Sequence, residues 1–475
     1  MTTATPPVSR PVSRGASLPL APLVPGEPVI GQLRNLQSRR LTFFTQTMLA
    51  YRDIARFRVL NLSAHLVIHP DGVRHMLQEN AKNYTKETRG FRQLRLVLGN
   101  GLVTSDGEFW LRQRRIAQPA FHKTKISGFA DTMVRAAVDL AGVWEAQARR
   151  GASLDVAQEM MRVTLRIAGE TLLSTDVTGD ANSIGASLTS LLANANRRIT
   201  APLDLPLHWP TPANVRFRRE LRVIDTVVGR IIAERRACPG EKPADLLSML
   251  MDARDESAAP GSEAGMTNEQ LRDEVMTMFL AGHETTANAL AWTFYCLSKH
   301  PSAQRQLTEE LDLVLNGRTP ALDDVPKLAF TQMVIKESMR LYPPAWAASR
   351  RAIDDDALCG YRVPAGDIVF FSPYATHRHP DFWENPEGFD PFRFTPEQEA
   401  KRPKFAFLPF GGGPRICIGN AFAMLEVTLV LATLAQRFQL DLVPGTKVEP
   451  EPQITLRPRH GLPMTLRRRE RVAGA

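Results

Sequence analysis

The sequence FGGGPRICIG spans Phe410–Gly419 and predicts a turn that leads into a helix. Three consecutive glycines followed by a proline disfavour a regular helix or strand. The residues after it, NAFAMLEVTLVLATLAQRF, repeat apolar side chains at helical spacing and predict a long helix. Cys417 therefore lies where a loop enters a helix, and the unpaired amides and positive dipole end there favour a thiolate. A thiolate can bind iron, whereas a lone cysteine after a turn is more often a buried apolar residue.

The residues around Cys417 resemble the haem-binding loop of the cytochrome P450 family. The resemblance rests on Phe410, the three glycines, Pro414, Arg415 two residues before the cysteine and Gly419 two residues after it. It implies that Cys417 is the axial ligand of the iron of haem b (iron protoporphyrin IX), and that Phe410, Arg415 and Gly419 also contact this cofactor. It also implies a mainly α-helical chain with a small β-rich subdomain, the cytochrome P450 fold.

A second motif lies in a long predicted helix that begins at Thr267 and ends before Pro301. The residues TNEQ at its start form a capping box, and the proline ends the helix. In its middle, AGHETTA (residues 281–287) places polar groups in an apolar stretch, where they are costly unless they are bonded or used. A zinc-protease site is excluded, because Ala287 stands where HExxH requires its second histidine. A structural kink remains an alternative interpretation.

The same motif is similar to the oxygen-binding segment of the cytochrome P450 family. By that resemblance Ala281 and Gly282 lie beside the haem, and Gly282 leaves room for dioxygen. Glu284 and Thr285 then form the acid–alcohol pair that delivers protons. Proton delivery requires a titratable group and a hydroxyl within hydrogen-bond reach.

Trp110 and Arg114 lie four residues apart in GEFWLRQRR and so share one helix face. A surface arginine stacked on a tryptophan is the structural alternative. In the family, this W-x-x-x-R pair reaches the haem propionates, and a planar guanidinium suits a carboxylate. Arg350, ten residues before Gly360, matches a further propionate-binding arginine, with Arg351 as its close competitor.

The sequence KESMRLYPP (residues 336–344) places Glu337 and Arg340 three residues apart on a predicted helix, where they can pair. E-x-x-R alone is uninformative, because any surface helix can contain it. Here it precedes a Tyr-Pro-Pro stop, and FDPFRF (residues 389–394) follows. The family couples this pair to an arginine of the later stretch, here Arg393, in a triad that is structural rather than catalytic.

The chain has 475 residues, of which 43% are hydrophobic, as is typical of a globular protein. Its four cysteines form no CxxC pair, which argues against a zinc ribbon or a disulfide framework. The net charge is +9, but no long run of Lys and Arg appears before residues 467–471, so a nucleic-acid partner is not expected. An acidic protein partner suits such a basic balance.

Residues 1–26 are rich in proline and predict a disordered extension, followed by a single cytochrome P450 domain over residues 27–475. No apolar run in the extension suits a signal peptide or a membrane span. We therefore expect a soluble, cytoplasmic monomer without a transmembrane anchor.

The resemblance implies a monooxygenase that activates O2 with two electrons and hydroxylates or epoxidises a lipophilic substrate such as a fatty acid, terpenoid or polyketide. Only 58 residues follow Cys417 in this chain of 475. Electrons are therefore expected from NAD(P)H through a separate reductase and a ferredoxin or flavodoxin. The alternatives are a peroxide-using peroxygenase or an isomerase of the same fold, or a non-catalytic haem-binding protein. The presence of Glu284 and Thr285 favours the monooxygenase.

Overall fold

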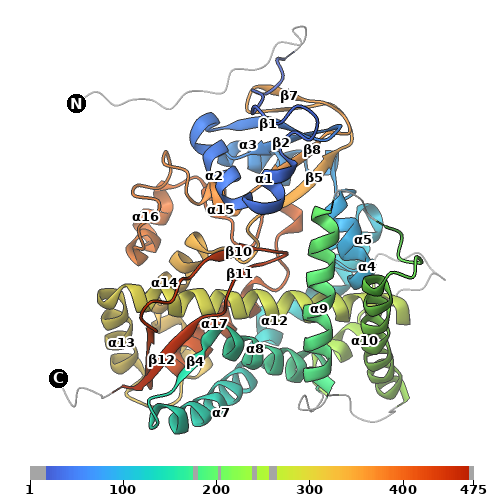
Figure 1. Cartoon of the computed structure of the whole chain (residues 1–475). Helices are drawn as coiled ribbons and strands as arrows, with labels where there is room; N and C mark the ends of the chain where they lie inside the picture. Colours follow the sequence, from blue (N-terminus) through green and yellow to red (C-terminus); the bar gives the residue numbers. More distant parts are fainter. Residues whose placement is uncertain (1–17, 175–179, 202–204, 238–242, 256–264, 470–475) are drawn as a thin grey trace, which may run out of the picture.

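Helices make up most of the molecule in the computed structural model, which describes residues 18–174, 180–201, 205–237, 243–255 and 265–469 (Figure 1). The α-helices are α1 (Leu33–Ser38), α2 (Arg40–Tyr51), α3 (Pro70–Arg74), α4 (Arg89–Leu98), α5 (Gly107–Ala117), α6 (Lys123–Ser127), α7 (Ala130–Ala148), α8 (Val156–Leu173), α9 (Asp180–Thr200), α10 (Pro212–Ala237), α11 (Leu246–Asp252), α12 (Asn268–Lys299), α13 (Pro301–Leu315), α14 (Ala329–Leu341), α15 (Pro373–Thr376), α16 (Pro396–Lys401) and α17 (Asn420–Ala435). Short 3-10 or π turns are η1 (His75–Glu79), η2 (Ala81–Asn83), η3 (Gln118–Phe121), η4 (Leu322–Lys327), η5 (Pro391–Phe394), η6 (Lys404–Ala406) and η7 (Gly413–Arg415).

Helix α12 crosses the whole molecule from side to side in Figure 1, and its 32 residues span roughly 48 Å at 1.5 Å per residue. The predicted capping box is confirmed: Gln270 N donates to Thr267 Oγ1 at 3.2 Å, and Thr267 N donates to Gln270 Oε1 at 3.0 Å. The helix ends at His300, and Pro301 begins α13. Most side chains of α12 are buried, because α8, α10, α14 and α17 pack around it.

The predicted helix after the glycine-rich loop is also confirmed, as α17. Its residues are buried from Leu425 onwards, because it packs against α7, α12 and α14. Its first residue directly follows the loop that carries Cys417. The packing of α17 against α12 therefore brings that loop close to the middle of α12.

The strands form a small part of the fold. Five of them make a sheet in the order β1 (Ile54–Val59), β2 (Leu62–Val67), β8 (Ile368–Phe371), β5 (Ala348–Ala352), β3 (Tyr84–Thr85). The other strands form short sheets: β4 (Ser153–Asp155) with β12 (Pro463–Arg468) and β9 (Phe438–Leu442), β10 (Pro450–Pro452) with β11 (Leu456–Pro458), and β6 (Asp356–Leu358) with β7 (Tyr361–Val363). The β2–β8 pair is parallel and the other pairs are antiparallel. The expected mainly helical fold with a small β-rich subdomain is thus confirmed.

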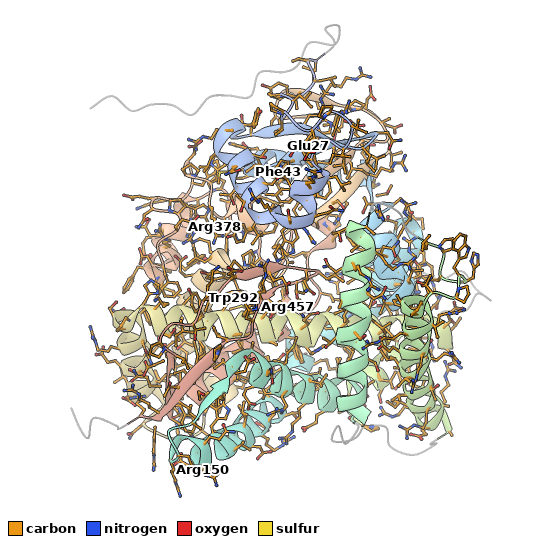
Figure 2. The ribbon with its side chains drawn as sticks, viewed as in Figure 1. Glu27, Phe43, Arg150, Trp292, Arg378 and Arg457 are labelled. Atoms are coloured by element: carbon orange, nitrogen blue, oxygen red, sulfur yellow. The ribbon has the colours of Figure 1, made fainter. Side chains whose placement is uncertain are left out.

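The five-stranded sheet and α2 enclose an aromatic core of their own. Phe43, labelled in the upper part of Figure 2, is buried and meets the ring of Phe57 edge-on at 5.3 Å between centroids. Trp292, labelled near the centre of the same view, is fully buried on α12. The two cores therefore lie in different parts of the molecule, the first beside the sheet and the second along the long helix.

The end of the predicted N-terminal extension differs from the expectation. Residues 1–17 lie outside the described residues, but residues 18–26 pack on the sheet. Ala21 is buried, and the backbone N–H of Val24 donates to Arg56 O at 2.7 Å. The proline-rich composition misled the prediction here, because proline is also suited to an extended segment that lies along a sheet edge.

Among the described residues, no helix has both the length and the apolar character needed to span a membrane.

Candidate active site

The loop Phe410–Gly419 adopts a conformation that depends on its glycines. Gly411 and Gly413 have φ of +72° and +67°, which is the left-handed region. A Cβ on Gly413 would overlap the carbonyl oxygen of Leu77, and a Cβ on Gly412 would overlap the ring of Phe405. The backbone N–H of Cys417 donates to Phe410 O at 2.9 Å and closes the loop. Gly413 thus lies against the π-helical turn η1, and the closed loop holds Cys417 at a defined place.

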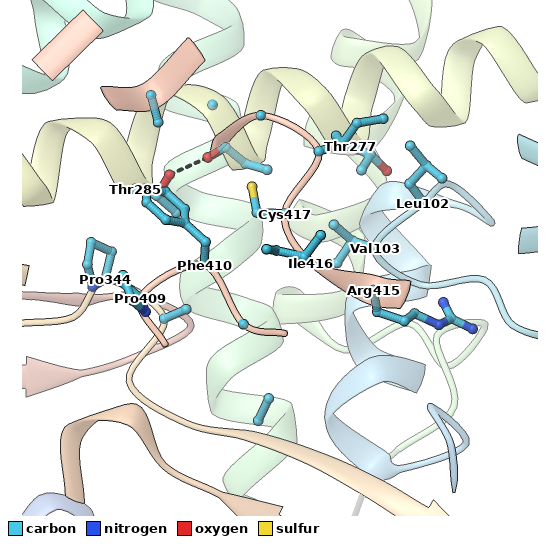
Figure 3. Close-up of a pocket in the computed structure, with 18 of the residues that line it drawn as sticks. Leu102, Val103, Thr277, Thr285, Pro344, Pro409, Phe410, Arg415, Ile416 and Cys417 are labelled. Atoms are coloured by element: carbon cyan, nitrogen blue, oxygen red, sulfur yellow. Dashed lines mark hydrogen bonds between the residues drawn. The ribbon is translucent and has the colours of Figure 1, made fainter. Parts of the chain in front are cut away.

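The sulfur of Cys417 points from the loop toward α12 (Figure 3). Its side chain is accessible, although it lies deep in the molecule, because it faces an internal cavity. Burial raises the pKa of the Cys417 thiol, and the Gly419 amide and the Arg114 guanidinium lower it by less. The expectation that the helix entrance favours a thiolate is thus corrected: in the chain alone, desolvation outweighs the local dipoles. A metal cation bound to the sulfur would remove the proton outright.

The cavity between Cys417 and α12 has a volume of about 360 Å³ (Figure 3). It is bounded mainly by apolar side chains, among them Phe91, Leu102, Leu172, Met278, Phe371 and Phe422. Such a lining suits a large apolar ligand rather than a polar one.

One face of α12 contributes Ala281, Gly282, Thr285 and Ala289 to this cavity. Thr285 Oγ1 donates to Ala281 O at 2.5 Å, the bond drawn in Figure 3. A Cβ on Gly282 would meet no heavy atom within 4 Å, so this glycine leaves open space above the helix. The structure therefore brings the first, second, fifth and sixth residues of the AGHETTA motif to the cavity that Cys417 faces.

Glu284 does not line the cavity, although Thr285 follows it in the sequence. Its side chain is buried, with 7% of its surface exposed, on a different face of α12. Thr455 Oγ1 donates to Glu284 Oε1 at 2.6 Å. Burial raises the pKa of Glu284, and the bond from Thr455 and the charge of Arg457 oppose that shift. The two members of the expected acid–alcohol pair thus point in different directions.

Basic side chains gather at one end of the cavity. Its described lining contains four of them and no acidic side chain: Lys86, Arg114, Arg350 and Arg415. Arg415 donates to Asp106 Oδ1 at 2.5 Å, and its guanidinium lies 3.9 Å from the centre of the Trp110 ring. Arg114 donates to Ile416 O at 3.0 Å. Trp110 and Arg114 both face the cavity as expected from their spacing, and the cation that stacks on Trp110 is Arg415.

Arg350 and its competitor Arg351 are separated by the alternation of strand β5. Arg350 lines the cavity and is buried, with its guanidinium 5.5 Å from the ring of Phe91. Arg351 points to the opposite side of the strand, is exposed, and donates to Gly366 O at 3.2 Å. Successive residues of a strand face opposite sides, so only one of the two can reach the cavity.

Lys86 was not identified from the sequence. It follows β3 directly, is buried, and donates to Val103 O at 2.8 Å. Burial lowers the pKa of Lys86 well below its ordinary value, and the neighbouring Arg350 and Arg415 lower it further. Burial likewise lowers the pKa values of Arg350 and Arg415 to about 10. A single lysine in an irregular stretch carries no local signal, and only the fold shows that it joins this group.

These residues fit a haem. A thiol at one side of an apolar cavity can ligate the iron. The cations at one end, of which Arg415 also pairs with Asp106, can hold the two carboxylates of a porphyrin edge. The carboxylate of Asp106 acts on Lys86, Arg350 and Arg415 and offsets part of their positive charge. The positive charge that remains suits an anionic group at that end of the cavity.

Glu337 and Arg340 of α14 form a fully buried ion pair. Arg340 Nε donates to Glu337 Oε2 and Arg340 Nη2 donates to Glu337 Oε1, each at 2.7 Å. Arg340 also donates to Pro386 O at 2.6 Å and to Gly388 O at 2.8 Å. Arg393 lies 3.4 Å from Glu337 Oε1 through its Nε. The structure therefore brings the three residues together and ties α14 to the segment that precedes the cysteine loop.

Residues 22–463 match the sequence model of the family Cytochrome P450. Cyclooctatin synthase of Streptomyces melanosporofaciens is 37% identical over 422 residues, which cover 89% of this chain and 90% of that protein. Pentalenene oxygenase of Streptomyces avermitilis is 35% identical over 424 residues, which cover 89% and 92%. A crystal structure of the cytochrome P450DA heme domain superposes with a TM-score of 0.86 at 26% identity, covering 96% of this chain and 99% of that chain.

Proposed function

The chain belongs to the cytochrome P450 family and is a monooxygenase, and on that premise we propose that it hydroxylates or epoxidises a neutral cyclic terpenoid. The observation that carries the proposal is the apolar cavity between Cys417 and the Thr285 face of α12. Relatives named for the oxidation of pentalenene and of cyclooctat-9-en-7-ol support an unsaturated cyclic skeleton.

When bound, haem supplies the reduction of dioxygen and the insertion of oxygen, and the chain supplies the surroundings. In our proposal Cys417 ligates the iron, with Phe410 and Gly419 beside it. Ala281 and Gly282 would flank the cavity on the side of α12. The two carboxylates of the haem would be held by Trp110, Arg114, Arg350 and Arg415, together with Lys86.

A neutral substrate is favoured over a fatty acid by the charges of the cavity. Of the four basic side chains that line the described part of the cavity, Lys86, Arg350 and Arg415 lie close to one another. The fourth, Arg114, bonds to the cysteine loop. The remaining polar groups of the lining include the hydroxyls of Thr277, Thr285 and Thr286, which carry no charge. A carboxylate placed among apolar side chains would pay its desolvation without a partner.

We therefore expect the binding affinity of ligands to depend on their charge. Cyclic terpenoid hydrocarbons and alcohols should give binding spectra at concentrations at least tenfold lower than fatty acids of similar size, a difference of roughly 1.4 kcal/mol. The measurement is titration of the purified haem protein with each ligand, followed by the shift of the haem absorption band. Tighter binding of the fatty acids would overturn the assignment of the substrate class.

We propose that Thr285 and Glu284 deliver protons during oxygen reduction. Thr285 Oγ1 faces the cavity and can hold a hydroxyl proton or a water there, and Glu284 can resupply it. Without a correctly placed second proton, reduced dioxygen leaves as hydrogen peroxide.

The Thr285→Ala variant should keep haem, substrate binding and NAD(P)H consumption. Product per NAD(P)H should fall by about tenfold or more, and peroxide should rise in its place. The measurement is product and peroxide per NAD(P)H oxidised with a surrogate ferredoxin system. Thr285→Ser retains the hydroxyl and is the matched control. Unchanged coupling in Thr285→Ala would remove the main support for this proton route, and the absence of any oxygenated product in the unaltered protein would favour the haem carrier or sensor.

We propose that electrons come from NAD(P)H through a separate reductase and an acidic ferredoxin or flavodoxin, and that the chain acts as a cytoplasmic monomer. The net charge of +9 is complementary to such a carrier. Exposed lysines beside the cysteine loop would contact it, for example Lys123 at the start of α6, which packs against α17.

A further inference from the structure

Helix α12 has two functional faces that are set by its periodicity. Ala281, Thr285 and Ala289 repeat at intervals of four residues and line the cavity. Glu284, Asn288 and Trp292 repeat at the same interval of four residues, and their side chains are buried on another face of the helix. The proposed proton donor therefore belongs to a row of side chains that does not face the cavity.

A single segment from the C-terminal part of the chain contacts all three residues of this second row. Thr455 Oγ1 donates to Glu284 Oε1 at 2.6 Å, and Asn288 Nδ2 donates to Thr455 Oγ1 at 3.1 Å. One turn further on, Trp292 Nε1 donates to Leu456 O at 2.9 Å. Figure 2 shows Trp292 and Arg457 close together at the centre of the molecule, where this segment passes α12.

The neighbouring bonds keep the segment in place. Leu456 N donates to Pro344 O at 2.9 Å, and Trp346 Nε1 donates to Gln453 O at 2.8 Å. Thr455 itself is buried, with 6% of its surface exposed. The backbone on both sides of Thr455 is therefore fixed, and Thr455 cannot follow Glu284 freely.

The direction of the bonds determines what Thr455 can offer. Because the Asn288 amide N–H donates to the hydroxyl oxygen, the single hydroxyl proton of Thr455 is left for Glu284. A donated proton stabilises an ionised carboxylate, and a buried carboxylate without such a partner is costly.

We propose that Thr455, oriented by Asn288, is a positioning residue for Glu284. The hydroxyl of Thr455 holds one carboxyl oxygen of Glu284 and stabilises the carboxylate that remains after Glu284 has given up its proton. The proposal rests on the proposed role of Glu284. In the step itself, the second carboxyl oxygen releases its proton to an intervening water, because the side chains of Glu284 and Thr285 point in different directions. Glu284 becomes an anion, the O–H of Thr455 stays bonded to it, and solvent water returns the proton.

The charged groups around Glu284 are few in the described part of the chain. Arg457 of β11 is the charge that acts on it, and Arg457 is itself paired with Glu451 at 3.1 Å. His283, the preceding residue, bonds to Phe279 O, and burial lowers its pKa to about 4, so it is neutral near pH 7. Removal of the Thr455 hydroxyl should therefore raise the pKa of Glu284. Burial raises this pKa, and only the charge of Arg457 would then remain to lower it.

Thr455→Val in the haem-loaded protein should shift the alkaline limb of the rate of product formation upward by about one pH unit. The alkaline limb shifts upward because only protonated Glu284 can donate a proton, and a higher pKa keeps Glu284 protonated to higher pH. The rate on the plateau should fall, because Glu284 is then a weaker acid. Thr455→Ser should restore the profile, and Asn288→Ala should give a smaller shift in the same direction.

Thr293→Val is the matched control. Thr293 is a buried threonine of the same helix, and its Oγ1 donates to Ala289 O at 2.7 Å without touching Glu284. This variant should leave the midpoint of the limb unchanged. A second readout needs no turnover: the infrared band of the protonated Glu284 carboxyl, taken as a difference from Glu284→Gln, should titrate at higher pH in Thr455→Val.

The outcomes separate the two proposals. If Glu284→Gln leaves both the alkaline limb and the coupling unchanged, the proposed proton role of Glu284 fails. If Glu284→Gln removes the limb while Thr455→Val and Asn288→Ala match the unaltered protein in both readouts, Thr455 does not position Glu284. Should Thr455→Val fail to fold, Asn288→Ala still decides the question through the same pH profile.

Discussion

Replacement of Cys417 by serine should abolish the strongly red-shifted absorption band of the reduced carbon monoxide complex. That band requires a thiolate on the iron. Among the cysteines that the structure describes, Cys417 is the one that lines the cavity opposite Thr285. Serine keeps the size of the side chain and fits the loop, so the variant should fold. The expected loss of the band is complete, because the serine hydroxyl does not replace a thiolate as a ligand of the iron.

The controls for this experiment are Cys296→Ser and Cys359→Ser. Burial raises the pKa of each thiol to about 12, and neither residue lines the cavity. Cys296 lies within α12 near Ser338, and Cys359 lies beside Gly72. Both variants should keep the full band. A band that survives in Cys417→Ser and disappears in one of the others would show that the ligand is misassigned.

Glu337→Ala should destabilise the protein by about 3–5 kcal/mol, because it leaves Arg340 buried without its charged partner. Both side chains have no exposed surface, so water cannot replace the lost carboxylate. The backbone carbonyls of Pro386 and Gly388 would still accept from Arg340, but they carry no charge. The expected result is a low yield of soluble, haem-loaded protein and a urea midpoint far below that of the unaltered chain.

Lys336→Ala is the matched control on the same helix. Lys336 precedes Glu337 and pairs with Glu399 at 2.9 Å, with 30% of its side chain exposed. An ion pair with this exposure contributes at most about 1 kcal/mol, so the control should unfold close to the unaltered chain. Equal urea midpoints for Glu337→Ala and Lys336→Ala, with full haem content in both, would refute a stabilising role for the buried pair.

Features that depend on the local backbone could be predicted from the sequence alone. The helix from Thr267 to His300 was identified by its capping box and by the proline that follows it. The loop before Cys417 was identified by its glycines, two of which adopt positive φ. Capping, turn geometry and helical periodicity act over a few residues, and these interactions are the same wherever the segment lies in the fold.

The resemblance to the family supplied what local patterns could not. E-x-x-R is uninformative by itself, yet Glu337 and Arg340 lie in a buried pair with Arg393 beside them. The same is true of Trp110 and Arg114, whose spacing predicted a shared face and nothing about a cofactor. In both cases the meaning of the pattern depends on a partner far away in the chain.

The sequence by itself determined the helix that crosses the molecule, the glycine-dependent loop that carries Cys417 and the family to which the chain belongs. Only the tertiary structure decided that Arg350 rather than Arg351 faces the cavity, that Lys86 joins the cations, and that Glu284 turns toward Thr455. These features depend on burial and on contacts between segments far apart in the chain, such as that of Glu284 with Thr455, 171 residues away. Desolvation and long-range packing are properties of the folded chain, and no short stretch of sequence encodes them.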